Sequence, residues 1–246
     1  MKTQSISKLG GNTMRNLLVA MLILPLAFTA CKKEEQSADP VTEEEAVAVA
    51  TQAITPETGG IILQTNATLI LSVTNLSSAN CGVKKDTTIT GQLSNNTHAY
   101  AYNLNWSRTL TCNANVASSY AHTFIGNSSY TSPKMSSTDQ SKGNITIAGL
   151  EPSNTALTVT LGYERNGSQN SKVGKERNFT SKVLITGTGI KINKLSRQIT
   201  SGSGTLGITG VTSTGTSFSY NGTITFNGNN KATLVVTGGG TYNLQW

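Results

Sequence analysis

From residue 61 to residue 246, Thr, Val, Ile and Tyr alternate with small polar residues, and Gly, Asn and Ser interrupt this pattern at short intervals. A period of two places alternate side chains on opposite sides of a strand, so the pattern is typical of an antiparallel sheet that is buried on one side. We therefore expect an all-β fold, with one antiparallel domain over 61–246 arranged as a sandwich or as a large curved meander sheet. A chain of this length can bury a sizeable core.

The clearest predicted strand is "THAYAYNLNWSRTLTC", residues 97–112. Its even positions are large or basic and its odd positions small or polar, which indicates one buried or sticky side and one wet side. At roughly 3.3 Å per residue it would run about 50 Å, so we expect a bend or bulge within it. Tyr100, Tyr102 and Trp106 share one side and are candidates for an aromatic platform that binds sugar rings or a partner. The alternative is that these rings pack in the core.

Further strands are predicted between residues 120 and 246, separated by turn signals. Asn166–Gly167 and Asn227–Gly228 are candidates for two-residue hairpin turns, because both residues of such turns adopt positive φ. The predicted strands cover 120–125, 143–150, 156–163, 178–186, 204–209, 216–226, 232–237 and 241–246.

One short helix is predicted before this region, over 43–55 in "TEEEAVAVATQAIT". Thr42 can cap its N-terminus, and Glu45, three residues later, completes a capping box. The acidic first turn suits the positive end of the helix dipole. Pro56 and the Gly59–Gly60 pair prevent its continuation.

The N-terminal segment has the features of an export signal. An uncharged apolar run, 17–30, follows Arg15 and is too short to span a bilayer as a helix. Its end, Thr29-Ala30-Cys31, resembles the lipobox of bacterial lipoprotein signal peptides, with Phe28 where Leu or Val is commoner. The resemblance implies that 1–30 is removed and that Cys31 carries the lipid anchor. Met14 is an alternative start.

The sequence after Cys31 is a charged tether. "CKKEEQ" is similar to the export signals of Bacteroidota-type surface lipoproteins, with Lys33, Glu34 and Glu35 as the matching residues. The similarity implies a lipid-anchored protein at the outer face of the outer membrane; the alternative is a solvated spacer without a sorting role. We treat 31–60 as an acidic tether that includes the helix.

Beyond the tether the chain is basic, with 14 Lys and Arg against 5 Asp and Glu from residue 58 onward. Such a domain can bind anionic surfaces non-specifically. Its basic residues are scattered along the predicted strands, as on a solvated face, so we expect no specific nucleic-acid partner. The alternative is a dedicated site for a polyanion, and the densest basic group is Lys172, Lys175, Arg177 and Lys182.

Two cysteines remain besides Cys31, and in an exported chain two thiols are more often paired than free. We therefore predict a Cys81–Cys112 disulfide; the alternative is a reactive nucleophile. "DTT" at 86–88 resembles the O-glycosylation site of Bacteroidota-type exported proteins, which makes Thr87 a candidate for modification.

Ionisable residues that could perform catalysis are scarce. After the tether there are five acids, and the two histidines, His98 and His122, lie in phase with predicted strand aromatics. The sequence contains no "GxSxG", "HExxH" or paired "CxxC" motif. We expect neither an enzyme nor a bound cofactor or metal. The rival interpretation is a glycan-directed hydrolase on a β-sandwich, which would need two carboxylates facing one bond. The five acids are Asp86, Asp139, Glu151, Glu164 and Glu176.

As a whole, the chain resembles β-rich outer-membrane lipoproteins of the Bacteroidota type. The resemblance rests on the signal and tether, the acidic helix before a glycine pair, "CG" at 81–82, the aromatic strand ending in "TC", "RNGSQNSKV" at 165–173 and the C-terminal "YNGTITFNGNNKATLVV". It implies a location and a fold, and no particular activity. We expect a non-enzymatic binding, adhesive or structural role, with the membrane as one partner through Cys31 and a glycan or surface protein as another.

Overall fold

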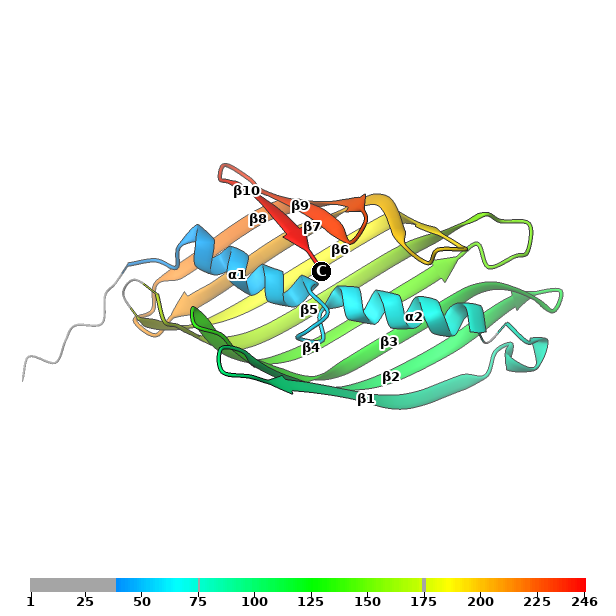
Figure 1. Ribbon diagram of the computed structural model, residues 1–246, viewed down its shortest axis with the longest axis horizontal. Coiled ribbons are helices and arrows are strands. Elements are labelled where there is room, and N and C mark those ends of the chain that lie inside the picture. The colour runs from blue at the N-terminus through cyan, green and yellow to red at the C-terminus, as the bar shows by residue number, and fades with distance from the viewer. Residues whose placement is uncertain (1–38, 75, 174–175) are drawn as a thin grey trace, which may run out of the picture. The chain divides into compact units, whose positions relative to one another are not determined.

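In the computed structural model, described over residues 39–74, 76–173 and 176–246, a single antiparallel sheet of ten strands carries two helices on one of its faces (Figure 1). The predicted antiparallel β fold is confirmed, and of the two expected arrangements the chain adopts the meander sheet. Every strand pairs with the next one along the chain, in the order β1 to β10.

The strands are long, and the longest has 17 residues. Long strands joined by short connections pair only with their neighbours in sequence, which produces the simple meander. The register between β2 and β3 shifts at Thr111/Cys112, so the irregularity expected in the aromatic strand lies near its end. The strands are β1 Lys84–Ser94, β2 Ala99–Asn113, β3 Val116–Thr131, β4 Met135–Ala148, β5 Ala156–Ser171, β6 Arg177–Asn193, β7 Ile199–Thr212, β8 Ser217–Gly228, β9 Lys231–Val236 and β10 Thr241–Gln245.

Of the two predicted hairpin turns, one is wrong and one is misplaced by two residues. Asn166 and Gly167 lie inside β5, where they continue the pairing with β4 and β6. The turn between β8 and β9 is made by Asn229 and Asn230, whose φ angles of 52° and 59° are those of a two-residue hairpin turn. Local turn propensity at Asn166–Gly167 is outweighed because both neighbouring strands pair with that segment.

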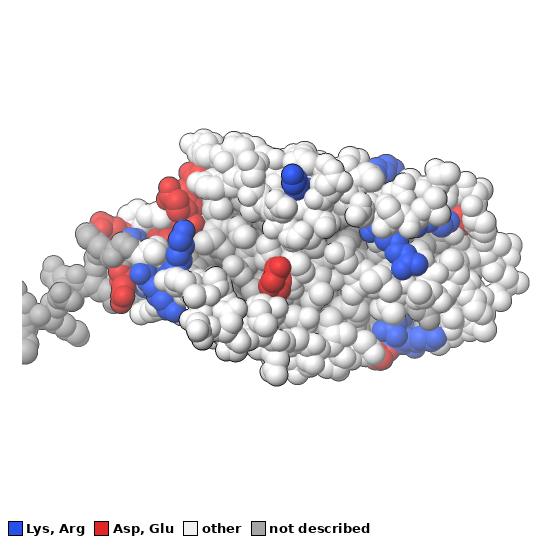
Figure 2. All heavy atoms as spheres, in the orientation of Figure 1, with Lys and Arg blue, Asp and Glu red and all other residues white. Residues whose placement is uncertain are grey.

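The first helix, α1 (Glu43–Ile54), confirms the predicted helix. The Thr42 side chain accepts a hydrogen bond from the Glu45 amide at 3.3 Å, and the Glu45 carboxylate accepts one from the Thr42 amide at 2.9 Å. Two amides that the helix cannot satisfy internally are thereby bonded. Three acids, Glu43, Glu44 and Glu45, form its first turn, and acidic atoms gather at the left of Figure 2, the side on which α1 begins in Figure 1.

The second helix, α2 (Ile61–Thr74), corrects the prediction that strands begin at Ile61. Its β-branched residues favour strands, and no capping motif marks its start. Buried positions nevertheless recur with the helical period, and the helix is held by packing on the sheet rather than by propensity. These positions are Ile61, Ile62, Thr65, Thr68, Leu69 and Ser72. A short 3-10 helix, η1 (Ser78–Asn80), then leads to β1, so the sheet itself starts at Lys84.

The core lies between the helices and the sheet. α1 contacts β6 and β7, whereas α2 contacts β3 and β4. We call this side of the sheet the helix face and the opposite side the open face. None of the described helices is long and apolar enough to cross a membrane. The predicted signal peptide, Cys31 and the proposed sorting residues lie outside the described residues.

The predicted disulfide is confirmed. Cys81 and Cys112 are bonded, with their Cα atoms 5.6 Å apart. Cys81 also forms an isolated β-bridge with Leu110 of β2. The bond therefore attaches the segment before the edge strand β1 to the end of β2.

Candidate functional site: the open face of the sheet

The aromatic side chains that were candidates for a binding platform lie on the helix face. Trp106 is only 4% exposed and contacts His122 edge to face, with ring centroids 4.5 Å apart. Tyr100 and Tyr102 are half-buried and pack against the core, where Gly59 of the α1–α2 connection lies close to Tyr102. These rings therefore pack in or against the core, which was the alternative interpretation.

The other candidate residues are dispersed. Thr87 lies half-buried on β1, opposite Trp106 in the pairing with β2. His98 is exposed just before β2 and its ring nitrogen contacts Thr97, whereas His122 is buried in the core. The structure does not bring the two histidines together, and the described residues contain no group of acids, histidines and cysteines that could hold a metal ion.

The carboxylates that could act on a glycosidic bond are divided between the two faces. Asp139 is buried on the helix face, where its Oδ2 atom lies 2.6 Å from Arg165 Nη2. Glu164 belongs to the open face, where it lies between Lys142, at 3.5 Å, and Lys182, at 3.2 Å. Its pKa is lowered by the hydrogen bond from Asn166 and by the two lysines. Asp139 and Glu164 lie on opposite sides of the sheet and cannot flank one bond. Asp86 shares the open face with Glu164 but lies on β1, four strands away from β5.

A shallow groove crosses the open face obliquely from β1 to β7. It consists of four hollows, and each shares side chains with the next. A twisted sheet is saddle-shaped, so each face is concave along one diagonal, which explains the oblique course. The shared side chains are Asn105 and Ile125, then Asn127, Gln140 and Asn166, then Thr138, Ser168 and Thr180.

A row of carboxamides crosses the groove, and three of its four members, Asn127, Gln140 and Asn166, line the middle of it. Asn103, Asn127, Gln140 and Asn166 face one another in register on β2, β3, β4 and β5. Neighbouring strands are about 4.8 Å apart, so the four groups form a regularly spaced row. We call this row the amide ladder. Each carboxamide offers two donors and an acceptor, and Asn166 uses one donor on Glu164 at 2.8 Å.

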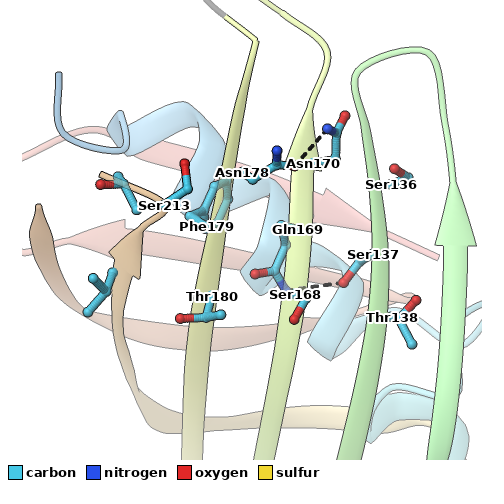
Figure 3. A pocket seen from close by; sticks show the side chains of 12 residues that line it. Ser136, Ser137, Thr138, Ser168, Gln169, Asn170, Asn178, Phe179, Thr180 and Ser213 are labelled. Atoms are coloured by element: carbon cyan, nitrogen blue, oxygen red, sulfur yellow. Dashed lines mark hydrogen bonds between the residues drawn. The ribbon is translucent and has the colours of Figure 1, made fainter. Parts of the chain in front are cut away.

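Hydroxyl groups continue the groove at its β4–β7 end, in a hollow of about 490 Å³. Figure 3 shows Thr138, Ser168 and Thr180 on neighbouring strands, with Asn170 donating to Asn178 across 2.8 Å. The same view shows the hydrogen bond from Gln169 to Ser137, whose side chains are buried on the helix face behind this hollow. This end therefore offers many neutral donors and acceptors.

A buried polar cluster on the helix face lies behind this groove. Besides Asp139, Arg165 donates to the main-chain carbonyl of Gln52 at 2.8 Å, in the last turn of α1. Asp139 also accepts from Ser137 at 2.6 Å and from Gln169 at 3.3 Å. A cation at the C-terminal end of a helix is favoured by the helix dipole. The cluster therefore fixes α1 on β4 and β5, the strands that carry half of the amide ladder.

Two features of this region were missed by sequence reasoning. Polar residues at alternate positions signal a wet sheet face, but only the register shows that four carboxamides lie side by side. The ion pair Arg165–Asp139 has no local signal, because its members are on different strands. Comparison of the chain with protein-family models, with curated proteins and with solved structures finds no significant match.

Proposed function

We propose that this protein is a lipid-anchored surface lipoprotein that binds an extended, uncharged glycan along the groove of the open face, without cleaving it. The amide ladder is the observation that carries the proposal. Carboxamides donate and accept hydrogen bonds at the same time, as the hydroxyl groups of a sugar do. A row that crosses four strands suits a linear polymer better than a compact ligand.

Charge and exposure also support a neutral, hydroxyl-rich ligand. Beside the middle of the groove, Glu164 pairs with both Lys142 and Lys182, so the net charge of these three groups is only +1. Exposed apolar side chains on this face, such as Ile125 and Leu184, are isolated among polar neighbours. Isolated apolar groups do not form the desolvated centre that a protein–protein interface needs.

Calorimetric titration of the purified protein with a panel of soluble linear neutral polysaccharides tests the binding site. We expect binding by the wild type and an affinity at least about tenfold lower in Asn127→Ala/Gln140→Ala, since each lost hydrogen bond contributes about 1 kcal/mol. Asn243→Ala is the matched control, because Asn243 is exposed on the same face but lies on β10, beyond the groove. Equal loss in the control, or no binding by the wild type, would contradict the proposal.

Two further measurements test the lipid anchor and the absence of glycan cleavage. The intact mass of protein extracted from its native membrane is expected to begin at Cys31 and to include acyl chains; a mass that begins elsewhere and lacks them would refute the anchor. The chain length of the bound polysaccharide is expected to stay constant during incubation. Shortening of the polymer would instead support the hydrolase interpretation.

A further inference from the structure

Three basic side chains lie in register on the helix face of the first three strands. Lys85 of β1 faces Arg108 of β2, and Arg108 faces His122 of β3. We call these three residues the basic row. Lys85 and Arg108 are half-buried, whereas His122 is 1% exposed. The row therefore leads from the edge of the sheet into the core.

No carboxylate balances the basic row among the described residues. The nearest acid along β1, Asp86, points to the open face and pairs with Lys84 at 3.6 Å. The elements on the helix face beside the row, α2 and η1, contain no charged residue. Like charges directly opposite on neighbouring strands are destabilising, and an uncompensated charge that is partly buried is more so.

The row also contains more hydrogen-bond donors than acceptors. Lys85 donates to the Asn80 side chain at 2.7 Å. Within the described part of the chain, Arg108 Nε and Nη1, both ring nitrogens of His122 and Nε1 of the adjacent Trp106 are buried without a hydrogen-bond partner. Buried polar atoms in folded proteins are nearly always bonded. Arg108 Nε and Nη1, the one protonated nitrogen of the neutral His122 ring and Trp106 Nε1 are all donors, so this concentration of unpartnered N–H groups would suit an acceptor with several oxygens.

We propose that the basic row is an anion site that binds a phosphate group, either free or on a lipid or sugar. A phosphate has oxygens on several sides and can accept from more than one strand at once, and guanidinium groups match its geometry. Entry would be from the β1 edge, where the half-buried Lys85 and Arg108 reach the surface, and the buried nitrogens would reorient toward the ligand. In Figure 2, basic atoms gather at the lower right, where β1 begins. The site lies on the face opposite the groove and does not depend on the proposed glycan binding.

Phosphate titration followed by NMR of the His122 ring tests this inference in the purified protein. At constant ionic strength, inorganic phosphate is expected to shift the His122 resonances saturably, to raise the pKa of His122 and to raise Tm by about 3 °C at ten times Kd. Arg108→Gln is expected to weaken binding at least about tenfold. Lys84→Gln is the matched control, because Lys84 is the neighbour of Lys85 on β1 but pairs with Asp86. It should leave the titration unchanged.

A parallel titration with phosphatidylglycerol vesicles in phosphatidylcholine identifies the source of the phosphate. Saturation by inorganic phosphate supports a free ion or a soluble ester, and a response to the vesicles alone supports a lipid headgroup. The inference is overturned if neither probe moves the His122 resonances, or if Arg108→Gln responds as the wild type does. Because Arg108→Gln removes an unbalanced charge, its Tm without phosphate should equal or exceed that of the wild type, which separates lost binding from lost folding.

Discussion

Arg165 Nη2 lies 2.6 Å from Asp139 Oδ2, and both side chains are at most 2% exposed beneath the connection between α1 and α2. The pair joins β5 to β4, and through Gln52 it also joins the sheet to the end of α1. An ion pair placed this deep is costly to desolvate, so its main effect is to specify where the helix packs.

Removal of one partner leaves the other as a buried charge. We expect Arg165→Met to lower the free energy of unfolding by about 3–5 kcal/mol, because Asp139 loses its countercharge. The double variant Arg165→Met/Asp139→Leu should recover most of that loss. Urea unfolding measures both values, and a double variant as unstable as the single one would contradict this account.

His122 makes stability dependent on pH. Burial, and to a smaller extent the nearby Arg108, lower the pKa of His122 from 6.5 to about 4. The unfolded chain therefore takes up this proton more readily than the folded one. The contribution of neutral His122 to the free energy of unfolding is fully present above pH 6.5. It is lost as the pH falls toward 4, which lowers the free energy of unfolding by about 3 kcal/mol at most.

His122→Leu should remove this part of the pH dependence. Urea unfolding between pH 7 and pH 4 is expected to show a smaller decrease for His122→Leu than for the wild type. His98→Leu is the control, since His98 is exposed. Parallel curves for the wild type and His122→Leu would exclude His122 as the responsible group.

The disulfide should stabilise the edge of the sheet. Cys81 and Cys112 are 31 residues apart in sequence, and closing a loop of that length contributes roughly 3–4 kcal/mol by the chain-entropy model. Cys81→Ala/Cys112→Ala is expected to lose about this amount in urea unfolding. Hydrogen exchange should accelerate most in β1, which pairs with β2 alone. Uniform acceleration across all strands would argue against a local role.

Glu43 connects α1 to the last hairpin. Its Oε1 atom accepts from the Gly240 amide at 2.6 Å and from the Tyr242 hydroxyl at 2.7 Å. The hydrogen bond to Glu43, together with smaller effects of burial and nearby acids, raises the pKa of Tyr242 to about 12.

We expect Glu43→Gln to return the pKa of Tyr242 toward 10, as followed by NMR of the tyrosine ring between pH 9 and pH 12. Glu44→Gln is the control, because Glu44 lies beside Glu43 but makes neither of these hydrogen bonds, so it should lower the pKa of Tyr242 by much less. An unchanged Tyr242 titration in Glu43→Gln would show that another interaction controls its ionisation.

The strand-rich pattern and the capped helix could be predicted from sequence because both are local signals. Period-two alternation predicts strands wherever one face is buried, and the Thr42–Glu45 capping box lies within four residues. The cysteine pair could be inferred from the number of cysteines and the expected compartment.

Tertiary contacts determined the features that local sequence signals do not specify, namely the conformation of Ile61–Thr74 and the face on which each strand side chain lies. Ile61–Thr74 is rich in β-branched residues and became a helix because the sheet offers it an apolar surface. Trp106 was placed in the core, and the amide ladder on the open face, by the face and register of each strand. Register is a property of pairs of strands, and a shift of one residue would exchange the two faces. Sequence alone therefore determined that this protein is mainly an antiparallel sheet, whereas contacts between distant segments determined which side chains lie on each face of that sheet.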